Sequence, residues 1–570
     1  MNSIADVRNK NLIKSVFVSI LLPALLAGAS ANLAGIIDGI IVGNIIGSEA
    51  VAAVNACRPA MQVYGFTAEI FASGLATCIA ISIGQNKKDD ANRLYSTGIF
   101  SALAVAVILT VLQLVFAKNI CRVFADDDAL YPLALEYYRY FLLSTFFILL
   151  SDSLAAVMRS DGMVKLSGAV LLLPHIVNAI LDFVLIKVFD LGLTGAAIAT
   201  VLGYVSGFLL CCYYYFFKRS YRFKAGNYLK NLGDIVSVGI PPATNMGLIT
   251  IKLLIVNSLA LSYGGTMGMT VMSMLMIAWA LESLFIGGIK QAMMPMISYY
   301  YGNGDYHGVR MVFIHACRIL MGIELALMVF LEIFPQSIPL LFGLRGAEDL
   351  ASVATAMRIF AIYLPMEAFI MLTITYYTAT KNRKTATLLS VLQGLAATVV
   401  VIYPLVHFFG LIGVWISFPI SSIVPILTIV FMSHGNSEKF FKMKGQTYLK
   451  EFSIDYSRIS DIVAAVIKAV SDAGFDSTIA NRTGVAIEEM AVSAFERNKG
   501  KKLHVDVTVK KVDEKLLVTF SDNGVEFDPT ANNGSSDAEQ LDNISMLKLV
   551  SHKIEYGRVI GINKTDIVLK

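Results

Sequence analysis

Two polar side chains inside an apolar stretch, residues 171–188, are the first candidates for chemistry in this sequence. Asn178 and Asp182 are four positions apart, so they share one face of a helix. A second apolar stretch follows the turn at 190–195 and carries Thr200. A carboxylate in the hydrocarbon region of a bilayer is costly, and such groups usually face a cavity or an ion path. Together the three residues offer oxygen ligands for a small hard cation, or a proton-binding group. The simpler alternative is an Asn–Asp pair that only joins helices by hydrogen bonds.

The composition excludes an ordinary soluble protein. The chain has 570 residues, of which 56% are hydrophobic and only 15% are charged, and its mean hydropathy is +0.66. Soluble domains carry about a quarter charged residues.

The six cysteines lie in or beside apolar stretches without metal-binding spacing, so we interpret them as small buried side chains. The basic, apolar N-terminus resembles a signal peptide, but its apolar stretch continues to Ile46, which favours a retained first helix.

Apolar segments long enough to cross a bilayer recur along most of the chain. About 20 residues are needed for one crossing. Twelve segments meet this length, which predicts an all-α polytopic membrane protein: 15–43, 53–83, 95–117, 131–158, 166–188, 194–217, 234–262, 267–299, 308–334, 352–378, 386–408 and 410–433.

The basic residues in the short connections predict the orientation. Cytoplasmic connections of membrane proteins are enriched in Lys and Arg. One side has clusters at 87–93, 218–230 and 381–384, whereas the other has only Lys118, Arg122, Lys187 and Arg345. The first side is therefore predicted to be cytoplasmic, with both termini and the C-terminal segment inside.

The membrane region repeats itself. GQNKKDDANR at 84–93 follows the second span, and GNGDYHGVR at 302–310 follows the eighth. Two six-helix lobes in the same order form a parallel repeat, with a pathway expected between them. We predict lobes at 1–217 and 234–433, joined by a cytoplasmic linker at 218–233. Within it, the basic segment 218–232 is predicted to form an interfacial helix.

The last part of the chain has a different character. Residues 434–446 are polar and basic and form a linker, and residues 447–570 have the pattern of a small soluble α/β domain. Apolar residues at helical spacing predict helices at 457–473 and 478–498, whereas alternation predicts strands at 502–510, 514–521 and 565–570.

Several motifs in the membrane region together resemble the multidrug and toxic compound extrusion (MATE) family, over about residues 10–433. They are Ile37-Asp38-Gly39, Gly84 before the basic loop, Met158-Arg159-Ser160-Asp161-Gly162, Asn178 with Asp182, and GLTGAAIAT. This family exchanges Na⁺ or H⁺ for amphipathic, often cationic, compounds by alternating access. The resemblance implies a cation or proton site at Asp38, Asn178, Asp182 and Thr200.

Other charges within the spans are open to two interpretations. Glu69, Glu282 and Glu367 are candidates for the wall of an acidic cavity. The alternative is that they form interhelical ion pairs, with Lys252 and Lys290 as the available partners.

The tail, about 450–570, resembles the histidine-kinase-like ATPase fold, an α/β sandwich, in its anti-sigma-factor kinase branch. Asp522-Asn523-Gly524 resembles the box that contacts adenine, and Glu489 occupies the position of the glutamate that activates water. The asparagine expected to hold Mg²⁺ is replaced by Ser493, and the glycines of the phosphate lid are absent near 543–556. The resemblance therefore implies possible nucleotide ligands at Glu489, Ser493, Asp522 and Gly524, but we expect no phosphotransfer.

The sequence as a whole predicts a secondary active transporter rather than an enzyme. We expect an antiporter in the cytoplasmic membrane of a bacterium that exports amphipathic or cationic small molecules in exchange for Na⁺ or H⁺, as a monomer. It needs no cofactor and binds no nucleic acid, and its C-terminal domain regulates transport and has a cytoplasmic protein partner. Two alternatives remain: a lipid-linked oligosaccharide flippase of the same superfamily, and a membrane sensor with an active kinase-like tail. No Gly-x-x-x-x-Gly-Lys-Ser/Thr loop is present, which argues against an ATP-driven pump.

Overall fold

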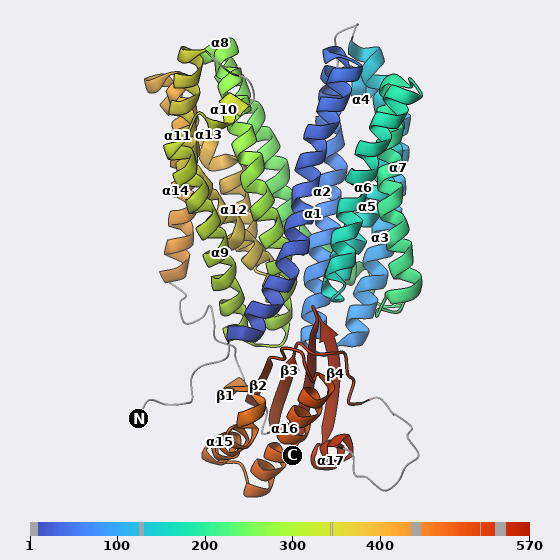
Figure 1. Cartoon of the computed structure of the whole chain (residues 1–570), viewed down its shortest axis with the longest axis vertical. Helices are drawn as coiled ribbons and strands as arrows, with labels where there is room; N and C mark the ends of the chain where they lie inside the picture. The colour runs from blue at the N-terminus through green and yellow to red at the C-terminus, as the bar shows by residue number, and fades with distance from the viewer. Residues whose placement is uncertain are drawn as a thin grey trace.

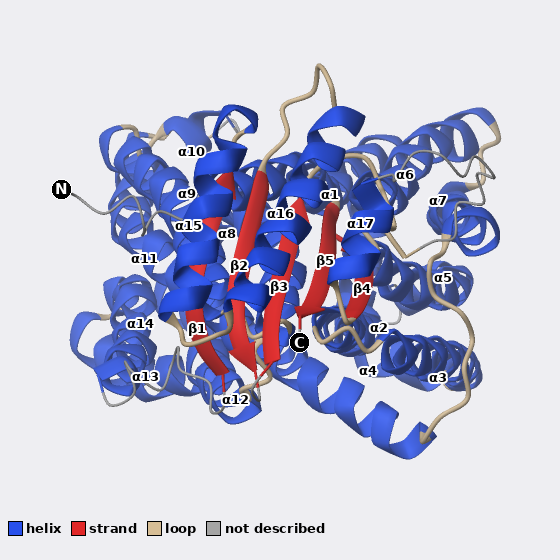
Figure 2. Ribbon diagram, turned by 90° about the horizontal axis from the view of Figure 1, so that it is seen from below, coloured by secondary structure: helices blue, strands red, loops and turns tan. Residues whose placement is uncertain are grey.

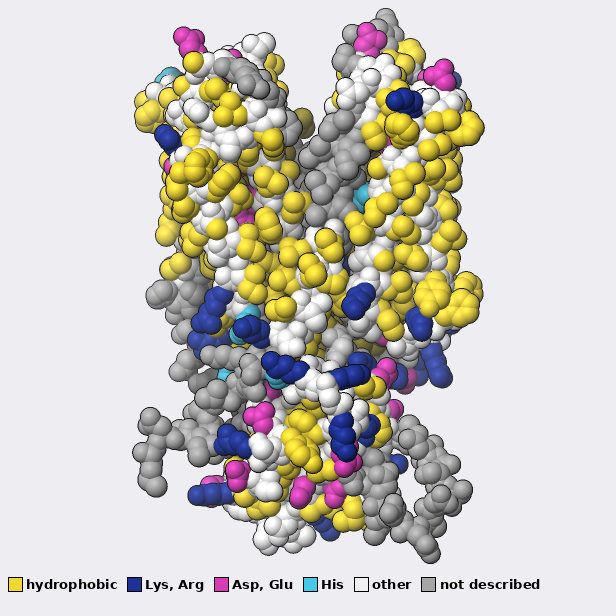
Figure 3. All heavy atoms as spheres, viewed as in Figure 1, with side chains coloured by type: hydrophobic (Ala, Val, Ile, Leu, Met, Phe, Trp, Pro, Cys, Tyr) yellow, Lys and Arg dark blue, Asp and Glu magenta, His cyan; other side chains and the backbone are white. Residues whose placement is uncertain are grey.

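Two helical lobes stand side by side above a small α/β domain in the computed structural model (Figure 1). The structure describes residues 10–124, 130–341, 344, 346–434, 446–512, 515–530 and 543–569. We call the ends of the helices that meet the α/β domain the domain side, and the opposite ends the far side. On the far side the two lobes diverge, and a hollow separates them in the space-filling view (Figure 3).

The first lobe, the N-lobe, contains α1 to α7. Its helices are α1 (Lys10–Ile45), α2 (Ser48–Gly84), α3 (Lys88–Val115), the short α4 (Ala117–Phe124), α5 (Leu130–Ser160), α6 (Val164–Asp182) and α7 (Gly192–Tyr213). Both α6 and α7 continue directly into π-helical turns, at Phe183–Val188 and Tyr214–Lys218.

The second lobe, the C-lobe, contains α8 to α14. Its helices are α8 (Tyr228–Gly302), α9 (Tyr306–Ile333), α10 (Ser337–Leu341), α11 (Ala347–Ala379), α12 (Arg383–Val391), α13 (Ala397–Phe409) and α14 (Leu411–His434), with a π-helical turn (Leu392–Ala396) joining α12 to α13. A straight helix of 75 residues would be about 110 Å long, far more than the thickness of a bilayer. Instead, α8 leaves the helical conformation at Gly265, where φ is 55° and ψ is −142°, and forms two spans.

The predicted number of spans agrees with these helices. Ten described helices are long and apolar enough, by length and composition, to cross a membrane. Because α8 supplies two spans and α1 adds another over its 36 residues, the described helices provide twelve crossing segments.

The segment between the lobes differs from the prediction. Residues 218–232 were expected to form an interfacial helix, but 219–227 have no helical structure and α8 begins at Tyr228. Three alternate backbone N–H groups of this segment donate to side chains of the N-lobe: Ser220 to Asp161, Arg222 to Asn92 and Lys224 to Ser96. Hydrogen bonds at alternate residues require an extended backbone. These contacts with the N-lobe therefore override the amphipathic pattern that predicted a helix.

The lobes touch most closely along α2 and α8 on the domain side. Four glycines allow this approach, because a Cβ atom on any of them would lie within 2.0–2.3 Å of a backbone oxygen of the other helix: Gly74, Gly84, Gly239 and Gly302. We call this contact the glycine seam. It closes the space between the lobes on the domain side.

The C-terminal domain is a five-stranded antiparallel sheet with three helices on one face (Figure 2). Its elements are β1 (Gln446–Ile454), α15 (Ile459–Asp472), α16 (Ser477–Arg497), β2 (Val505–Val512), β3 (Lys515–Asp522), α17 (Asn543–Val550), β4 (Lys553–Val559) and β5 (Ile562–Leu569). The strand order is β1-β2-β3-β5-β4. The two predicted helices and three predicted strands are confirmed to within three residues, whereas β1, α17 and β4 were not predicted as elements.

Alternation along the strands gives the sheet two different faces. Val505, Val507 and Val509 of β2 are fully buried in the core beneath the helices. The intervening residues, Asp506, Thr508 and Lys510, point to the other face, toward the membrane lobes.

Gly239→Ala should destabilise the folded protein, because the new Cβ would lie 2.0 Å from the carbonyl oxygen of Ile70 and force α2 and α8 apart. Overpacking of this kind costs about 1–3 kcal/mol. Gly247→Ala, on the same helix, is the matched control, since its nearest neighbour would be a Phe66 ring carbon at 3.6 Å. Thermal unfolding of the purified proteins in detergent measures the effect, and equal melting temperatures would contradict the seam.

Candidate functional site

Four polar residues that the sequence predicted as one site meet inside the N-lobe. Asp38 lies late in α1, Asn178 and Asp182 in the last turns of α6, and Thr200 in α7. The Asn178 Nδ2 donates to the Thr200 Oγ1 at 3.2 Å, and Thr200 in turn donates to the carbonyl oxygen of Ala196 at 3.1 Å. The carboxyl groups of Asp38 and Asp182 lie side by side, within hydrogen-bonding reach of each other if one of them is protonated.

The burial of Asp182 shows why this pair needs a positive charge. Its side chain has 0% exposure, and neither of its oxygens accepts a hydrogen bond from a described residue in the unprotonated state. Oδ1 of Asp38 is also buried without a donor among the described residues. A buried, unpaired carboxylate is strongly unfavourable. A proton shared by the pair, or a cation bound between the oxygens, would remove that penalty.

The local helix geometry places Asp182 at a break in the regular hydrogen-bond pattern. The α-helix ends at this residue and the π-helical turn Phe183–Val188 begins. Such turns are frequently found at functional sites, because they widen the helix and redirect its side chains.

A cavity of about 260 Å³ opens onto this group. Asp38, Asn178 and Thr200 line it, together with Arg58 of α2 and a set of aromatic and ring side chains: Tyr64, Tyr137, Phe141, Pro174, His175 and Tyr204. Arg58 is the only Lys or Arg among the lining residues, and it interacts electrostatically with Asp38. The site therefore combines two acids, one base, an amide and a hydroxyl.

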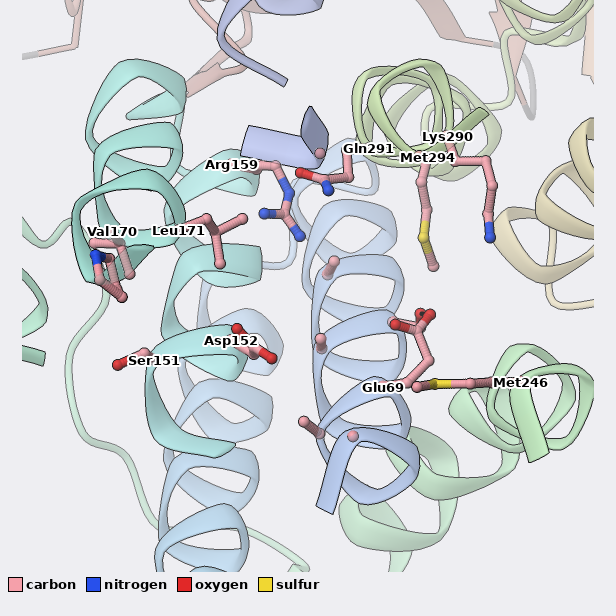
Figure 4. A pocket seen from close by; sticks show the side chains of 18 of the residues that line it. Glu69, Ser151, Asp152, Arg159, Val170, Leu171, Met246, Lys290, Gln291 and Met294 are labelled. Carbon is pink, nitrogen blue, oxygen red and sulfur yellow. Dashed lines mark hydrogen bonds between the residues drawn. The ribbon is translucent and has the colours of Figure 1, made fainter. Parts of the chain in front are cut away.

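A larger cavity of about 440 Å³ lies between the two lobes (Figure 4). Glu69 of α2 and Asp152 of α5 provide acidic groups, whereas Arg159 of α5 and Lys290 of α8 provide basic ones. Figure 4 shows these four side chains pointing toward the space between the helices. Met246, Met294, Val170 and Leu171 complete an amphipathic wall.

The charge of this cavity differs from the expectation. An acidic cavity was predicted, and Glu69 does line it, but Arg159 and Lys290 balance its two acids. Glu282 and Glu367 line neither of the two cavities and are buried within the C-lobe, at 0% and 1% exposure.

The C-lobe acids form a separate buried group. Glu367 accepts a hydrogen bond from the Trp279 Nε1 at 2.8 Å, and Lys252 interacts electrostatically with Glu367 and Glu282. Lys252 also donates to Tyr363 at 3.3 Å. Glu324 of α9 is a third buried glutamate near this group. Both carboxyl oxygens of Glu282 and of Glu324 are buried without a hydrogen-bond donor among the described residues, so Lys252 interacts with Glu282 only electrostatically.

The predicted nucleotide residues lie together in the C-terminal domain, but their polar groups are occupied by protein. Oδ1 of Asp522 accepts from the Asn563 Nδ2 and from the backbone N–H of Gly524, both at 2.8 Å. Burial raises the pKa of Asp522, and the hydrogen bond from Asn563 opposes that rise. A Cβ atom on Gly524 would lie 2.4 Å from Asn498, so Asn498 fills the space beside the glycine.

Ser493, the position that the resemblance assigns to a magnesium ligand, accepts a hydrogen bond from Arg497. The Arg497 guanidinium lies 3.3 Å above the centre of the Phe527 ring. A fixed cation at this position repels Mg²⁺ rather than binding it. Glu489 is half-buried on the same helix, α16.

Three polar residues of the membrane lobes were missed by the sequence interpretation: Arg58, Asp152 and Glu324. Each lies within a predicted span. The reasoning that singled out Asp182, that a charge inside a span is costly, applies equally to them. The sequence carried the signal, but it did not show which charges face a cavity.

Comparisons with known proteins agree on the membrane lobes. The family model MatE matches residues 23–184 and 241–405. The multidrug export protein MepA of Staphylococcus aureus is 23% identical over 376 residues, covering 64% of this chain and 81% of that protein. A structure titled as the outward-facing conformation of a multidrug resistance MATE family transporter of the MOP superfamily has a TM-score of 0.71 at 24% identity, covering 76% of this chain and 98% of that one. A MOP superfamily transporter from Pyrococcus furiosus, whose title reports reverse polarity of the binding pocket, has a TM-score of 0.69 at 24% identity, covering 77% and 99%.

Asp182→Asn should abolish the stabilisation of the protein by its coupling cation. A ligand that binds only the folded state stabilises it by about 2.7 kcal/mol at 100 times its Kd. We expect either added Na⁺ at constant ionic strength or lowered pH to raise the melting temperature of the native protein, and this shift to disappear in Asp182→Asn. Asp190→Asn, an exposed turn residue with φ of 53°, is the control and should keep the shift, since Asn also tolerates this conformation. The same shift in Asp182→Asn would exclude this aspartate as a ligand.

Proposed function

The chain belongs to the MATE family of membrane transporters, and on that premise we propose that it is a cation-coupled antiporter that exports amphipathic, cationic small molecules. The observation that carries this proposal is the buried pair Asp38–Asp182, with carboxyl oxygens that lack described donors beside a cavity. The coupling ion is Na⁺ or a proton. Either one supplies the positive charge that the pair requires.

We propose that α6 couples the ion site to the substrate cavity. Pro174 and His175 of α6, with Tyr204 of α7, line both the ion cavity and the cavity between the lobes. The rings of His175 and Tyr204 contact each other edge to face, with centroids 6.0 Å apart. Asp182 lies eight residues after Pro174 on the same helix. A change in its charge therefore alters the packing of the wall that the two cavities share.

Asp152 and Glu69 are proposed to attract the cationic part of the substrate, and the methionines to contact its apolar part. Methionine side chains adapt to different shapes, which suits a site that accepts several compounds. Because ion and substrate both carry positive charge, binding of one at the N-lobe disfavours the other. This competition is the basis of exchange by alternating access.

The arrangement of charges supports an orientation with the C-terminal domain in the cytoplasm of a bacterial cell. Lys and Arg side chains gather around the domain-side ends of the lobes (Figure 3). This distribution follows the enrichment of basic residues on the cytoplasmic side. The hollow on the far side then corresponds to a state open to the outside.

A second function, a flippase for lipid-linked oligosaccharides, is favoured by one observation, the pair of basic residues Arg159 and Lys290 in the cavity. These groups suit a phosphate-bearing lipid headgroup. The carboxylates of Glu69 and Asp152 oppose it. Transport assays that compare cationic dyes with anionic lipid analogues distinguish the two functions.

The C-terminal domain is proposed to be regulatory rather than catalytic. The Arg497 guanidinium bound to Ser493, and the Asn563 amide bound to Asp522, occupy the groups that nucleotide and Mg²⁺ need. We also propose that the domain binds a protein partner in the cytoplasm and that it transfers no phosphoryl group.

Asp38→Asn should abolish export of a cationic dye from proteoliposomes that carry an inward gradient of Na⁺ or H⁺. The amide cannot bind a proton, and it binds a cation far more weakly than a carboxylate does. Glu49→Gln, an exposed residue at the start of α2, is the control and should export at the native rate. Native export by Asp38→Asn at equal protein levels would refute a coupling role for the pair.

ATP with Mg²⁺ should not bind the full-length protein with micromolar affinity. Fluorescent ATP analogues, measured by anisotropy with and without Mg²⁺, test this. The control is Arg497→Ala, which removes the competing guanidinium. Magnesium-dependent binding by the native chain would show that Ser493 is an adequate ligand and would overturn the proposal that the domain acts without nucleotide.

A further inference from the structure

The C-terminal domain rests on the domain-side ends of both lobes through a polar face of its sheet. We call this the docking face: Asp506, Thr508, Lys510, Thr519, Lys564 and Asp566. Such residues on the second face of an antiparallel sheet normally contact water. Here each of them is only 2–6% exposed. The membrane lobes therefore cover a surface whose composition would suit solvent.

Two lysines of the docking face each bind the end of one helix. The Lys564 Nζ donates to the carbonyl oxygen of Gly84, the last residue of α2, at 3.0 Å. The Lys510 Nζ donates to the carbonyl oxygen of Asn303, directly after α8, at 3.0 Å. The last carbonyl groups of a helix lack intrahelical partners and carry partial negative charge, so an ammonium group is a suitable ligand.

These two helix ends are equivalent in the internal repeat, and they face each other across the glycine seam. The loops 84–93 and 302–310 follow corresponding spans of the two lobes. A Cβ atom on Gly84 would lie 2.3 Å from the carbonyl oxygen of Tyr299, and one on Gly302 would lie 2.3 Å from that of Ile81. The sheet of the C-terminal domain therefore binds the equivalent helix end of each lobe, that of α2 and that of α8.

A polar network fixes the contact with the N-lobe. Oδ1 of Asn86 accepts from the Lys564 Nζ at 3.1 Å, and its Nδ2 donates to Glu555 at 2.9 Å and also to Asp566. Asn86 has a φ of 58°, which asparagine tolerates better than most residues. Burial alone would raise the pKa of Asp566, but the Lys564 ammonium at 2.8 Å and the hydrogen bonds from Thr519 and Asn86 lower it instead.

The turn between β4 and β5 adds an apolar contact with the membrane lobes. Ile560 and Gly561 both have positive φ, at 57° and 77°, as a tight hairpin requires. Val559, Ile560 and Ile562 belong to one buried apolar cluster with residues of both lobes, Val164 of α6 and Tyr299 of α8 among them. The backbone N of Gly561 would lie 3.1 Å from a Cβ on Gly162, between α5 and α6.

We propose that the C-terminal domain is a conformational clamp that ties the domain-side ends of α2 and α8 together and so stabilises the state that is open on the far side. This inference rests on the proposed alternating-access function, because only a transporter of that kind must open the glycine seam in each cycle. Opening it separates the Gly84 and Asn303 carbonyl groups, so at least one lysine must release its helix end. The clamp thereby gives the domain control over the rate of transport without nucleotide chemistry.

The test measures the separation of the lobes in the full-length protein by double electron–electron resonance. Spin labels are placed at Lys88→Cys of α3 and Lys384→Cys of α12, both exposed, after the native cysteines have been replaced. We expect Lys510→Met and Lys564→Met each to increase the population with the larger separation about tenfold, as loss of a charge-assisted hydrogen bond implies. Lys515→Met is the control, since this lysine at the start of β3 is exposed and lies outside the docking face.

Asn86→Asp is a second variant that changes the N-lobe and leaves the fold of the C-terminal domain untouched. Its carboxylate would join Glu555 and Asp566 around the single ammonium group of Lys564, and the excess negative charge should release the domain, whereas Gln85→Glu at the neighbouring exposed position should not. An unchanged distance distribution in Lys510→Met, Lys564→Met and Asn86→Asp would overturn the clamp. The distances are measured without substrate. The result of this test therefore does not depend on whether Asp38→Asn loses transport.

Discussion

The cost of placing charge in the hydrocarbon region determines most of this structure. Backbone groups in the lobes are paired within helices, which leaves only side chains to introduce polarity. The lobes contain few buried charges, and these are concentrated at three places: the Asp38–Asp182 pair, the wall of the cavity between the lobes, and the glutamates around Lys252. Each place has a different solution. The cavity wall combines acids with bases, the C-lobe glutamates lie around one lysine, and the N-lobe pair has three buried carboxyl oxygens without donors among the described residues.

A second constraint is the close contact of α2 and α8, which brings the two lobes together on the domain side. Glycines allow the backbones to touch on the domain side, whereas the lobes diverge on the far side (Figure 3). Apolar side chains of the two helices also pack in one buried cluster, Leu75 and Cys78 of α2 with Ile235 and Val238 of α8, so opening the seam would expose apolar area. The C-terminal domain lies where it can add to this contact between the lobes.

The sequence was a good guide wherever one physical rule dominates. Hydrophobic length predicted the twelve spans, and period-two alternation predicted β2 and β3, because burial in lipid or under helices leaves little choice of pattern. Asn178 and Asp182 were singled out because they share a helix face, and Thr200 because it lies in the span after the turn, whereas the resemblance added Asp38. The linker 218–232 was misread as a helix, since its conformation depends on Asp161, Asn92 and Ser96, which are distant in sequence. The balance of charge in the cavity was also misread, because a linear pattern does not show which charged residues face the same space.

The docking face could not be inferred from the sequence for a related reason. Alternating polar residues in β2 and β5 indicate a sheet with one face in water, and this is the correct expectation for an isolated domain. In the full chain, the same residues lie against helix ends, whose carbonyl groups accept hydrogen bonds as water would. Release of the docking face itself would expose polar residues, whereas release of the β4–β5 turn would expose the apolar side chains of Val559, Ile560 and Ile562. A mainly polar contact of this kind is better suited to control of a moving transporter than a wholly apolar interface would be.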